Sequence, residues 1–133
     1  MTLPSNLIIN GNSLVDKFGY WPDFHDFEIL RLKMDRSGPF IAMHIYGFRT
    51  LKEIDEKGYF KKTNECVITL RFNSISEVVL ENFNQQNVLS ELTFEERDGL
   101  LKTTISTSFG LCGYIMSKTV EVVKTEPYKG KPV

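Results

Sequence analysis

The sequence predicts a mainly β domain (α+β at most), an antiparallel β-sandwich or a strongly bent sheet of about eight strands, with a short N-terminal helix. Three observations predict this fold class. Apolar and polar residues alternate with a period of two in several segments. Turn-forming residues recur roughly every eight to twelve positions. Asp98-Gly99 is a dipeptide that favours a two-residue hairpin turn.

A short helix is expected near residues 13–18. Ser13 and Asp16 have the spacing of a capping box, in which the two side chains satisfy backbone N–H groups of the first turn. Phe18 falls on the apolar side of this helix. Gly19 is expected to end it, since glycine readily adopts the left-handed conformation found after a helix.

Period-two alternation predicts four strands in the middle of the chain, at residues 30–34, 40–46, 66–72 and around 78–80. Between the second and third of these, residues 51–63 are charged and show no alternation. We therefore expect residues 51–63 to form a long loop or a frayed helical turn.

The best-specified element is a hairpin over residues 91–106, turning at Asp98-Gly99. A type I′ turn there places Arg97 opposite Leu100 and fixes every later pair. One face then holds apolar residues, and a slip by one residue would move them into water. The predicted pairs are Glu96–Leu101, Glu95–Lys102, Phe94–Thr103, Thr93–Thr104, Leu92–Ile105 and Glu91–Ser106.

The end of the chain continues the strand pattern. The two glycines within residues 109–113 suit a bend, and short strands are expected at 114–116 and 119–123. Residues 127–133 form a polar tail that we expect to fray. Residues 1–133 are expected to form one domain, because this length supports one core.

Composition narrows the class of protein. Sixteen basic and seventeen acidic residues give a net charge of −1, which argues against a nucleic-acid partner. No apolar run is long enough for a membrane span, and the first residues do not resemble a signal peptide. We therefore expect a cytoplasmic protein with no membrane partner, whose cysteines, Cys66 and Cys112, are reduced.

Residues 18–28 are the most informative stretch of the chain. They read Phe-Gly-Tyr-Trp-Pro-Asp-Phe-His-Asp-Phe-Glu and hold the only tryptophan, one of two histidines and three carboxylates. Glycine and proline mark the segment as a structured loop. Such a loop is either a plug for the core or a recognition surface.

Two chemical hypotheses compete with a purely structural role for this segment. Asp23, His25 and Asp26, joined by His44, could form the site of a small metal-dependent hydrolase, although the ligand spacing is incomplete. Trp21 could instead be the platform of a ligand-binding β-sandwich. The structural alternative is that His25 and Asp26 hydrogen-bond backbone groups where the loop joins a strand. No nucleophile elbow, phosphate loop or zinc-protease motif is present, so we expect neither catalysis nor a cofactor or metal.

The same segment resembles the F-G-x-W-P-x-F-H-D-x-E motif of the Immunity protein 50 family of bacterial polymorphic toxin systems. The likeness continues in Cys66-Val-Ile-Thr-Leu-Arg-Phe, in Phe83-Asn-Gln-Gln-Asn-Val-Leu and in the closing strands. Phe27 departs from the pattern, because a small residue is expected there. The motif residues, structural or binding, are Phe18, Gly19, Trp21, Pro22, Phe24, His25, Asp26 and Glu28.

The resemblance implies an immunity protein that binds and neutralises a cognate toxin without being an enzyme. Exposed loops on a rigid scaffold are the expected contact sites. The candidates lie in the charged connection at residues 52–57 and in the polar stretch at residues 81–86. The predicted toxin-contact residues are Lys52, Glu53, Asp55, Glu56, Asn84 and Gln86.

Overall fold

Alternation of apolar and polar residues builds strands over most of the chain, and the predicted fold class is confirmed. The computed structural model describes residues 3–128, except for the side chains of residues 52 and 60. Within that range no helix has the length and apolar character needed to span a membrane. The elements are β1 (Ile8–Ile9), α1 (Asn12–Phe18), β2 (Glu28–Asp35), β3 (Phe40–Ile54), β4 (Phe60–Glu81), β5 (Val88–Arg97), β6 (Leu100–Phe109) and β7 (Cys112–Pro127).

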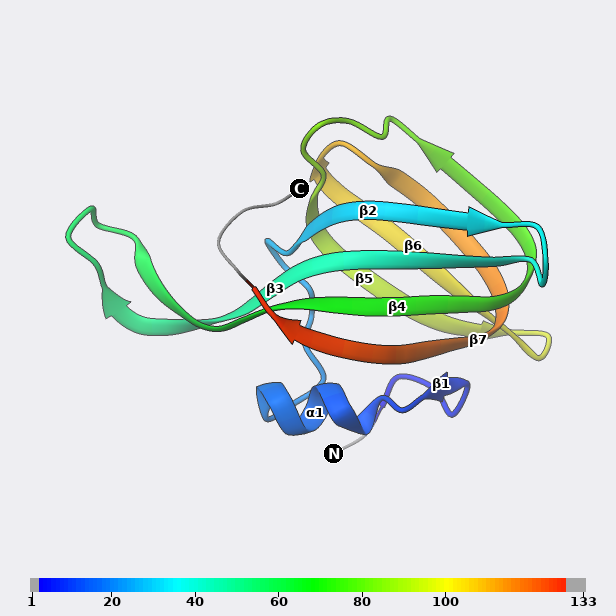
Figure 1. The fold of residues 1–133 in the computed structure, drawn as a ribbon, viewed down its shortest axis with the longest axis horizontal. Helices are drawn as coiled ribbons and strands as arrows, with labels where there is room; N and C mark the ends of the chain where they lie inside the picture. The colour runs from blue at the N-terminus through cyan, green and yellow to red at the C-terminus, as the bar shows by residue number, and fades with distance from the viewer. Residues whose placement is uncertain (1–2, 129–133) are drawn as a thin grey trace.

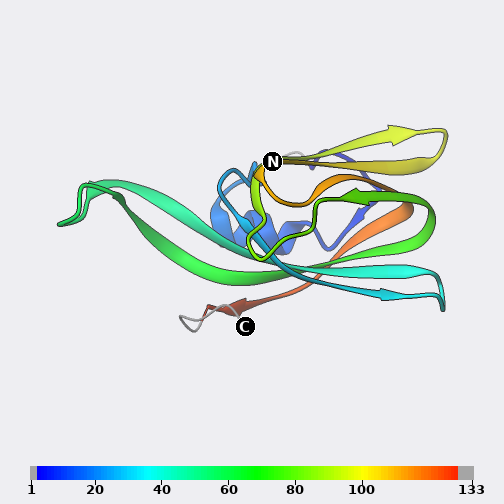
Figure 2. The same cartoon turned by 90° about the horizontal axis from the view of Figure 1, so that it is seen from above.

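The strands form one strongly bent sheet in the order β1-β7-β4-β3-β2-β5-β6, and a further pairing of β6 with β7 closes it on itself. Figures 1 and 2 show the resulting two layers. One layer holds β2, β3, the first part of β4 and the last part of β7. The other holds β5 and β6 with the remaining parts of β4 and β7. All pairings are antiparallel except that of the two-residue β1 with β7.

The sheet has seven strands rather than about eight, because two pairs of predicted strands are continuous and one short strand, β1, is additional. The strands predicted at 66–72 and 78–80 both belong to β4, which bends where Ser74 adopts a φ of 55° and the register shifts after Ile75. This bulge turns the strand into the second layer without ending its pairing with β7. The two short strands predicted after residue 113 are likewise parts of β7.

The prediction of a loop or helical turn at residues 51–63 is wrong. β3 and β4 continue through this region as a two-stranded arm (residues 49–63) that projects from the body (Figures 1 and 2). The turn at its tip is built by Asp55, whose carboxylate accepts the N–H groups of Lys57 and Tyr59 at 2.9 and 3.0 Å. Gly58 supplies the left-handed residue, with a φ of 85°. An Asp followed three residues later by Gly is typical of a β-turn. The prediction for residues 51–63 relied on their charged composition and did not use this signal.

The helix is confirmed, but its predicted capping box is wrong. α1 begins one residue earlier than expected, with Gly11 at the N-cap and no side-chain cap. Ser13 lies inside the first turn, where its hydroxyl donates to the carbonyl of Asn10 at 2.8 Å. Gly19 ends the helix in the left-handed conformation, as predicted.

The hairpin is confirmed pair by pair. Arg97 lies opposite Leu100, and all six predicted pairs from Glu96–Leu101 to Glu91–Ser106 are present. Asp98 and Gly99 both have positive φ, as a type I′ turn requires. Of the predicted frayed tail, Pro127 belongs to β7 and the N–H of Tyr128 bonds the carbonyl of Glu65, whereas residues 129–133 lie outside the described residues.

Candidate functional site

An aromatic plug (Phe18, Trp21, Phe24, Phe27 and Phe94) closes one side of the sandwich, which we call the helix side because α1 lies there (Figure 1). Phe24 is fully buried at its centre, with ring centroids 5.8 Å from Trp21, 5.5 Å from Phe27 and 6.3 Å from Phe94. Phe18 brings α1 against Phe27, and Phe94 belongs to β5. These rings therefore hold the helix and the two layers together, with Trp21 only partly buried.

Backbone hydrogen bonds fasten the end of this loop to β5. The N–H of Asp26 donates to the carbonyl of Leu89, and the N–H of Leu89 donates to the carbonyl of Phe27, both at 2.8 Å. Asp23, not Asp26, supplies the carboxylate that accepts a backbone donor, the N–H of His25 at 2.9 Å. The role predicted for the Asp26 side chain is wrong: its carboxylate is 63% exposed and lies beside His25 Nε2, at 3.6 Å, rather than against a backbone donor of the described residues.

His25 lies on the outside of the loop. Its Nδ1 lies 3.0 Å from the carbonyl oxygen of Ser90, and its Nε2 lies 3.6 Å from the carboxylate of Asp26. The hydrogen bond to Ser90, followed by the charge of Asp26, raises the pKa of this imidazole. The predicted backbone contact of His25 is therefore confirmed.

The other motif residues have local structural positions. Gly19 ends α1, Pro22 is buried and Glu28 is half-buried at the start of β2. Burial raises the pKa of the Glu28 carboxyl.

The four residues of the hydrolase hypothesis do not assemble into a ligand set. His44 lies on the outward face of β3, opposite Arg31 on β2 and Thr69 on β4. In the part of the chain that the structure describes, no group of three or more His, Cys, Asp and Glu side chains could hold a metal ion. Burial, followed by the charge of Arg31, lowers the pKa of His44.

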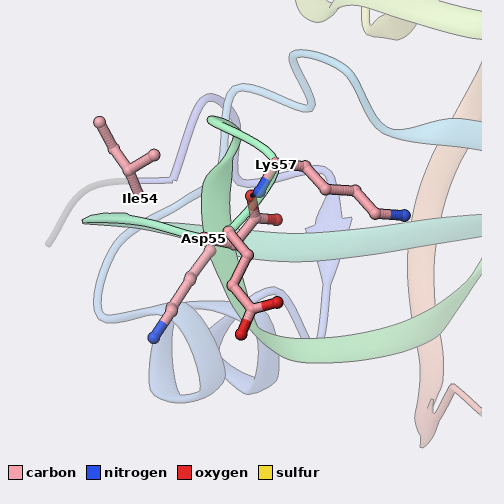
Figure 3. A pocket seen from close by; sticks show the side chains of 5 residues that line it. Ile54, Asp55 and Lys57 are labelled. Atoms are coloured by element: carbon pink, nitrogen blue, oxygen red, sulfur yellow. Dashed lines mark hydrogen bonds between the residues drawn. The ribbon is translucent and has the colours of Figure 1, made fainter.

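The arm tip carries most of the predicted contact residues. Figure 3 shows Asp55 and Lys57 at the turn, with Ile54 pointing away from both. Ile54 and Tyr59 are 59% and 69% exposed, and Glu56 is exposed beside them. The other predicted residues here are Glu53, whose carboxylate lies 3.6 Å from Lys61 Nζ, and Lys52, whose side chain lies outside the described part.

The loop at residues 82–87 carries the other two predicted contact residues, Asn84 and Gln86, both exposed. Asn87 holds this loop in place. Its buried side-chain carbonyl accepts the N–H groups of Asn84 and Leu111 at 3.0 and 2.9 Å, and its amide donates to the carbonyl of Asn84 at 2.8 Å.

An apolar cleft of about 290 Å³ lies between the layers on the side opposite the plug. We call this the open side; it comprises residues 30–35 of β2, residues 75–81 of β4 and the loop at 82–87 (Figure 2). The cleft is lined by Leu32, Met34, Leu80, Phe83 and Leu111.

Residues 10–128 match the Immunity protein 50 (Imm50) family. The matched region covers most of the chain and includes the aromatic loop, the arm and the open side. The chain belongs to the Imm50 family. No curated protein and no solved structure matches it.

In this Imm50 protein the predicted site residues lie in three separate places: the helix side, the arm tip and the 82–87 loop. Sequence reasoning missed the backbone-accepting role of Asp23, and it missed Asn87 and the cleft. Asp23 stands two residues before the N–H that it accepts, which is the spacing of an Asx turn and a usable signal. The side-chain carbonyl of Asn87 accepts the N–H of Leu111, 24 residues away in sequence, and no local sequence pattern predicts such a contact.

Both cysteines are free, as predicted. Cys66 lies opposite Pro127, and Cys112 lies opposite Glu81, at the two ends of the ladder between β4 and β7. A disulfide needs Cα atoms within about 7 Å, so the two thiols cannot pair in this fold. Burial raises the pKa of the Cys66 thiol, which disfavours the reactive thiolate.

Proposed function

We propose that this Imm50 protein neutralises a cognate toxin of a bacterial polymorphic toxin system by stoichiometric binding, without chemical turnover. The observation that carries the proposal is the family match over residues 10–128. An immunity protein acts by covering a functional surface of its toxin, so it needs an interface rather than a catalytic site. We place the complex in the cytoplasm, where free thiols such as Cys66 and Cys112 stay reduced.

The arm tip and the 82–87 loop are the contact sites that we propose first. At the arm tip, Ile54 and Tyr59 offer exposed apolar anchors within a rim of charges that includes Glu53, Asp55 and Glu56. Binding energy at interfaces concentrates in such anchors, while surrounding charges govern specificity and the association rate. An interface of standard size covers about 800 Å² on each partner, so we expect the arm tip and the 82–87 loop to act together with a neighbouring strand.

Co-expression tests the proposal directly. Cells that make the protein encoded by the adjacent upstream gene, the candidate toxin, should survive only when this Imm50 protein is also made. The two proteins should then co-purify in equal amounts. Toxicity that persists in its presence, or the absence of any complex, would contradict the proposal.

A double substitution separates binding from catalysis. His25→Asn with His44→Gln removes both imidazoles, and we expect the variant to protect cells as well as the parent. Circular dichroism and thermal unfolding confirm that it is folded. A folded double variant that still binds the toxin but no longer protects would indicate catalysis instead.

A further inference from the structure

The open side presents two strand edges that lack a second partner among residues 3–128. The pairing of β2 with β5 is limited to Glu28 and Val88, so residues 30–35 of β2 pair with β3 alone. The ladder between β3 and β4 ends at Asn73. Apart from the N–H of Ile75, which donates to the carbonyl of Pro39 at 3.0 Å, residues 75–81 of β4 pair with β7 alone. Alternate N–H and C=O groups of such an edge point outward and can pair with another chain.

The apolar cleft lies directly inside these edges. Leu32 and Met34 reach it from β2, and Leu80 and Phe83 reach it from the end of β4 and the following loop. Met34 and Phe83 are 59% and 57% exposed, so water now covers much of their apolar surface. The cleft volume of about 290 Å³ lies at the lower limit for small-molecule pockets, and it suits a few protein side chains.

The outward face of the same edge is basic. Arg31 and Lys33 alternate with the cleft-lining residues of β2 and are exposed, and the described residues show no ion pair with either. Their charges also reach His44 on the neighbouring strand, where both disfavour its protonation. The carboxylate of Asp35, the acidic group at the end of β2, is held by the N–H of Ser37 at 2.8 Å.

We propose that the open side binds an extended segment of the toxin, with alternating apolar and acidic residues, as an added strand on β2. This inference rests on the proposed function and names the contact that it requires. Side chains of an added strand alternate between the two faces of the sheet. Its apolar residues would enter the cleft, and its acidic residues would lie beside Arg31 and Lys33. Backbone pairing would supply affinity and the cleft would supply specificity.

Charge also disfavours a second copy of this chain as the occupant. If two β2 edges paired antiparallel and symmetrically about Leu32, Arg31 of each copy would lie opposite Lys33 of the other. Like charges directly opposite one another on paired strands are destabilising. An acidic segment has no such conflict.

A peptide probe tests the cleft without the toxin. The acidic probe is an acetylated, amidated peptide in which glutamate alternates with valine and leucine. The comparison probe is the same peptide with lysine in place of every glutamate. The acidic peptide should bind the full chain, and Met34→Lys should weaken this binding by roughly tenfold or more, because an inward-facing charge blocks strand addition. Ile9→Lys is the matched control: Ile9 is an apolar residue that is 45% exposed in β1, beside α1 and away from the cleft (Figure 1), and its substitution should leave binding unchanged.

Charge reversal and amide exchange supply independent readouts. Arg31→Glu with Lys33→Glu should reverse the preference, so that the lysine peptide binds and the glutamate peptide does not. Outward N–H groups within residues 30–35 should exchange more slowly when the acidic peptide is bound. Equal binding of both peptides by the parent, or unchanged exchange in β2, would overturn the inference.

The toxin completes the test. Met34→Lys should reduce capture of the toxin, whereas Ile9→Lys should leave it unchanged. Equal capture by parent and Met34→Lys overturns the cleft as the docking site but leaves the proposed function intact. If the toxin does not bind any form, the proposed function fails, and the peptide result still decides whether the cleft accepts a strand. If the chain alone forms a dimer and Met34→Lys makes it monomeric, the occupant of the cleft is a second copy of this chain. That result would also overturn the inference.

Discussion

The helix side and the open side of this sandwich differ in what fills the gap between the layers. On the helix side, α1 and the aromatic loop enter the gap between the layers, and three backbone hydrogen bonds join the loop and the start of β2 to residues 87–89. On the open side, the gap is left as a cleft bordered by two unpaired edges within the described chain. The densest aromatic segment of the sequence therefore packs the core, although its composition also suits recognition.

A pair of phenylalanines makes this difference concrete. Phe24 is fully buried at the centre of the plug, whereas Phe83 is 57% exposed at the mouth of the cleft. Phe83 follows Asn82, whose φ is 63°, in the loop that Asn87 fixes. Phe24 therefore packs in the core, whereas Phe83 leaves much of its apolar surface in water.

The largest effect is expected from Phe24→Ala. Removing a fully buried aromatic ring leaves a cavity and should lower the free energy of unfolding by about 3–5 kcal/mol. Trp21→Ala should also destabilise the protein, by less, because Trp21 is only partly buried. Urea unfolding measured by tryptophan fluorescence for Phe24→Ala, and by circular dichroism for Trp21→Ala, checks both values.

Phe83→Ala is the matched control on the open side. It should change stability by no more than about 0.5 kcal/mol, as for most exposed positions, while weakening capture of the toxin. The comparison fails if Phe83→Ala destabilises the fold as strongly as Phe24→Ala, or if Phe24→Ala is neutral.

A smaller effect is expected from Asn87→Ala, which tests whether the open side is held in shape by one side chain. The substitution leaves the N–H groups of Asn84 and Leu111 without their acceptor, at a cost of about 1–3 kcal/mol. Asn87→Asp keeps the acceptor of both N–H groups, but it buries a carboxylate and sets an oxygen against the carbonyl of Asn84, so it should preserve the local hydrogen bond at Leu111 without preserving full stability. Amide exchange should be faster at Leu111 in Asn87→Ala than in Asn87→Asp; equal exchange in the two would contradict this role.

Local pattern predicted the parts of the fold that local chemistry determines. The 91–106 hairpin was predicted in register because the Asp98-Gly99 turn and the apolar face each require the same pairing. The arm was not predicted, because its stability comes from the ladder between β3 and β4 and from the Asp55 turn, not from alternation. The sequence predicts two strands, at 66–72 and 78–80, where the structure has the single bent strand β4, since the residues of a bulge resemble those of a turn.

The candidate site was less predictable, for a physical reason. A cleft forms where strands diverge, and its walls come from Leu32, Leu80 and Leu111, which are distant in sequence. The alternation over residues 30–34 places Met34 on the same face of β2 as Leu32. Met34 is nevertheless 59% exposed, because residues 30–35 of β2 have no neighbouring strand on that side within residues 3–128. Sequence alternation specifies a face, whereas exposure depends on the whole topology.

A third prediction concerns the arm, which belongs to neither side. Asp55→Ala removes the acceptor of two backbone N–H groups at the tip, and the local cost should be about 1 kcal/mol. Because the tip is remote from the plug and the cleft, we expect faster amide exchange at Lys57 and Tyr59 with no change in the global urea midpoint. Asp98→Ala at the other hairpin tip is a comparison variant. A global loss of stability in Asp55→Ala would show that the arm folds together with the body.

The smallest expected effect is on the pH dependence of stability, to which His25 and His44 contribute with opposite sign. His25 accompanies the aromatic loop, where the carbonyl of Ser90 raises its pKa above the ordinary 6.5. His44 lies on the sheet face beside the open side, where burial and then Arg31 and Lys124 lower its pKa below 6.5, with Glu126 opposing them. The folded state therefore takes up a proton at His25 more readily than the unfolded chain does, and takes one up at His44 less readily.

These shifts have opposite consequences for stability. The contribution of His25 is fully present below pH 6.5 and is lost as the pH rises through its raised folded pKa. The penalty from His44 is absent above pH 6.5 and grows as the pH falls toward its lowered folded pKa, because the unfolded chain binds the proton first. Between about pH 7.5 and about pH 5.5, His44→Gln should raise the urea midpoint at the acidic end relative to the parent, and His25→Asn should lower it. Shifts in the same direction for both variants would contradict these assignments.

The acidic peptide bound beside Arg31 should also offset the positive charge near His44 and raise its pKa in an NMR titration, whereas the pKa of His25 should stay unchanged.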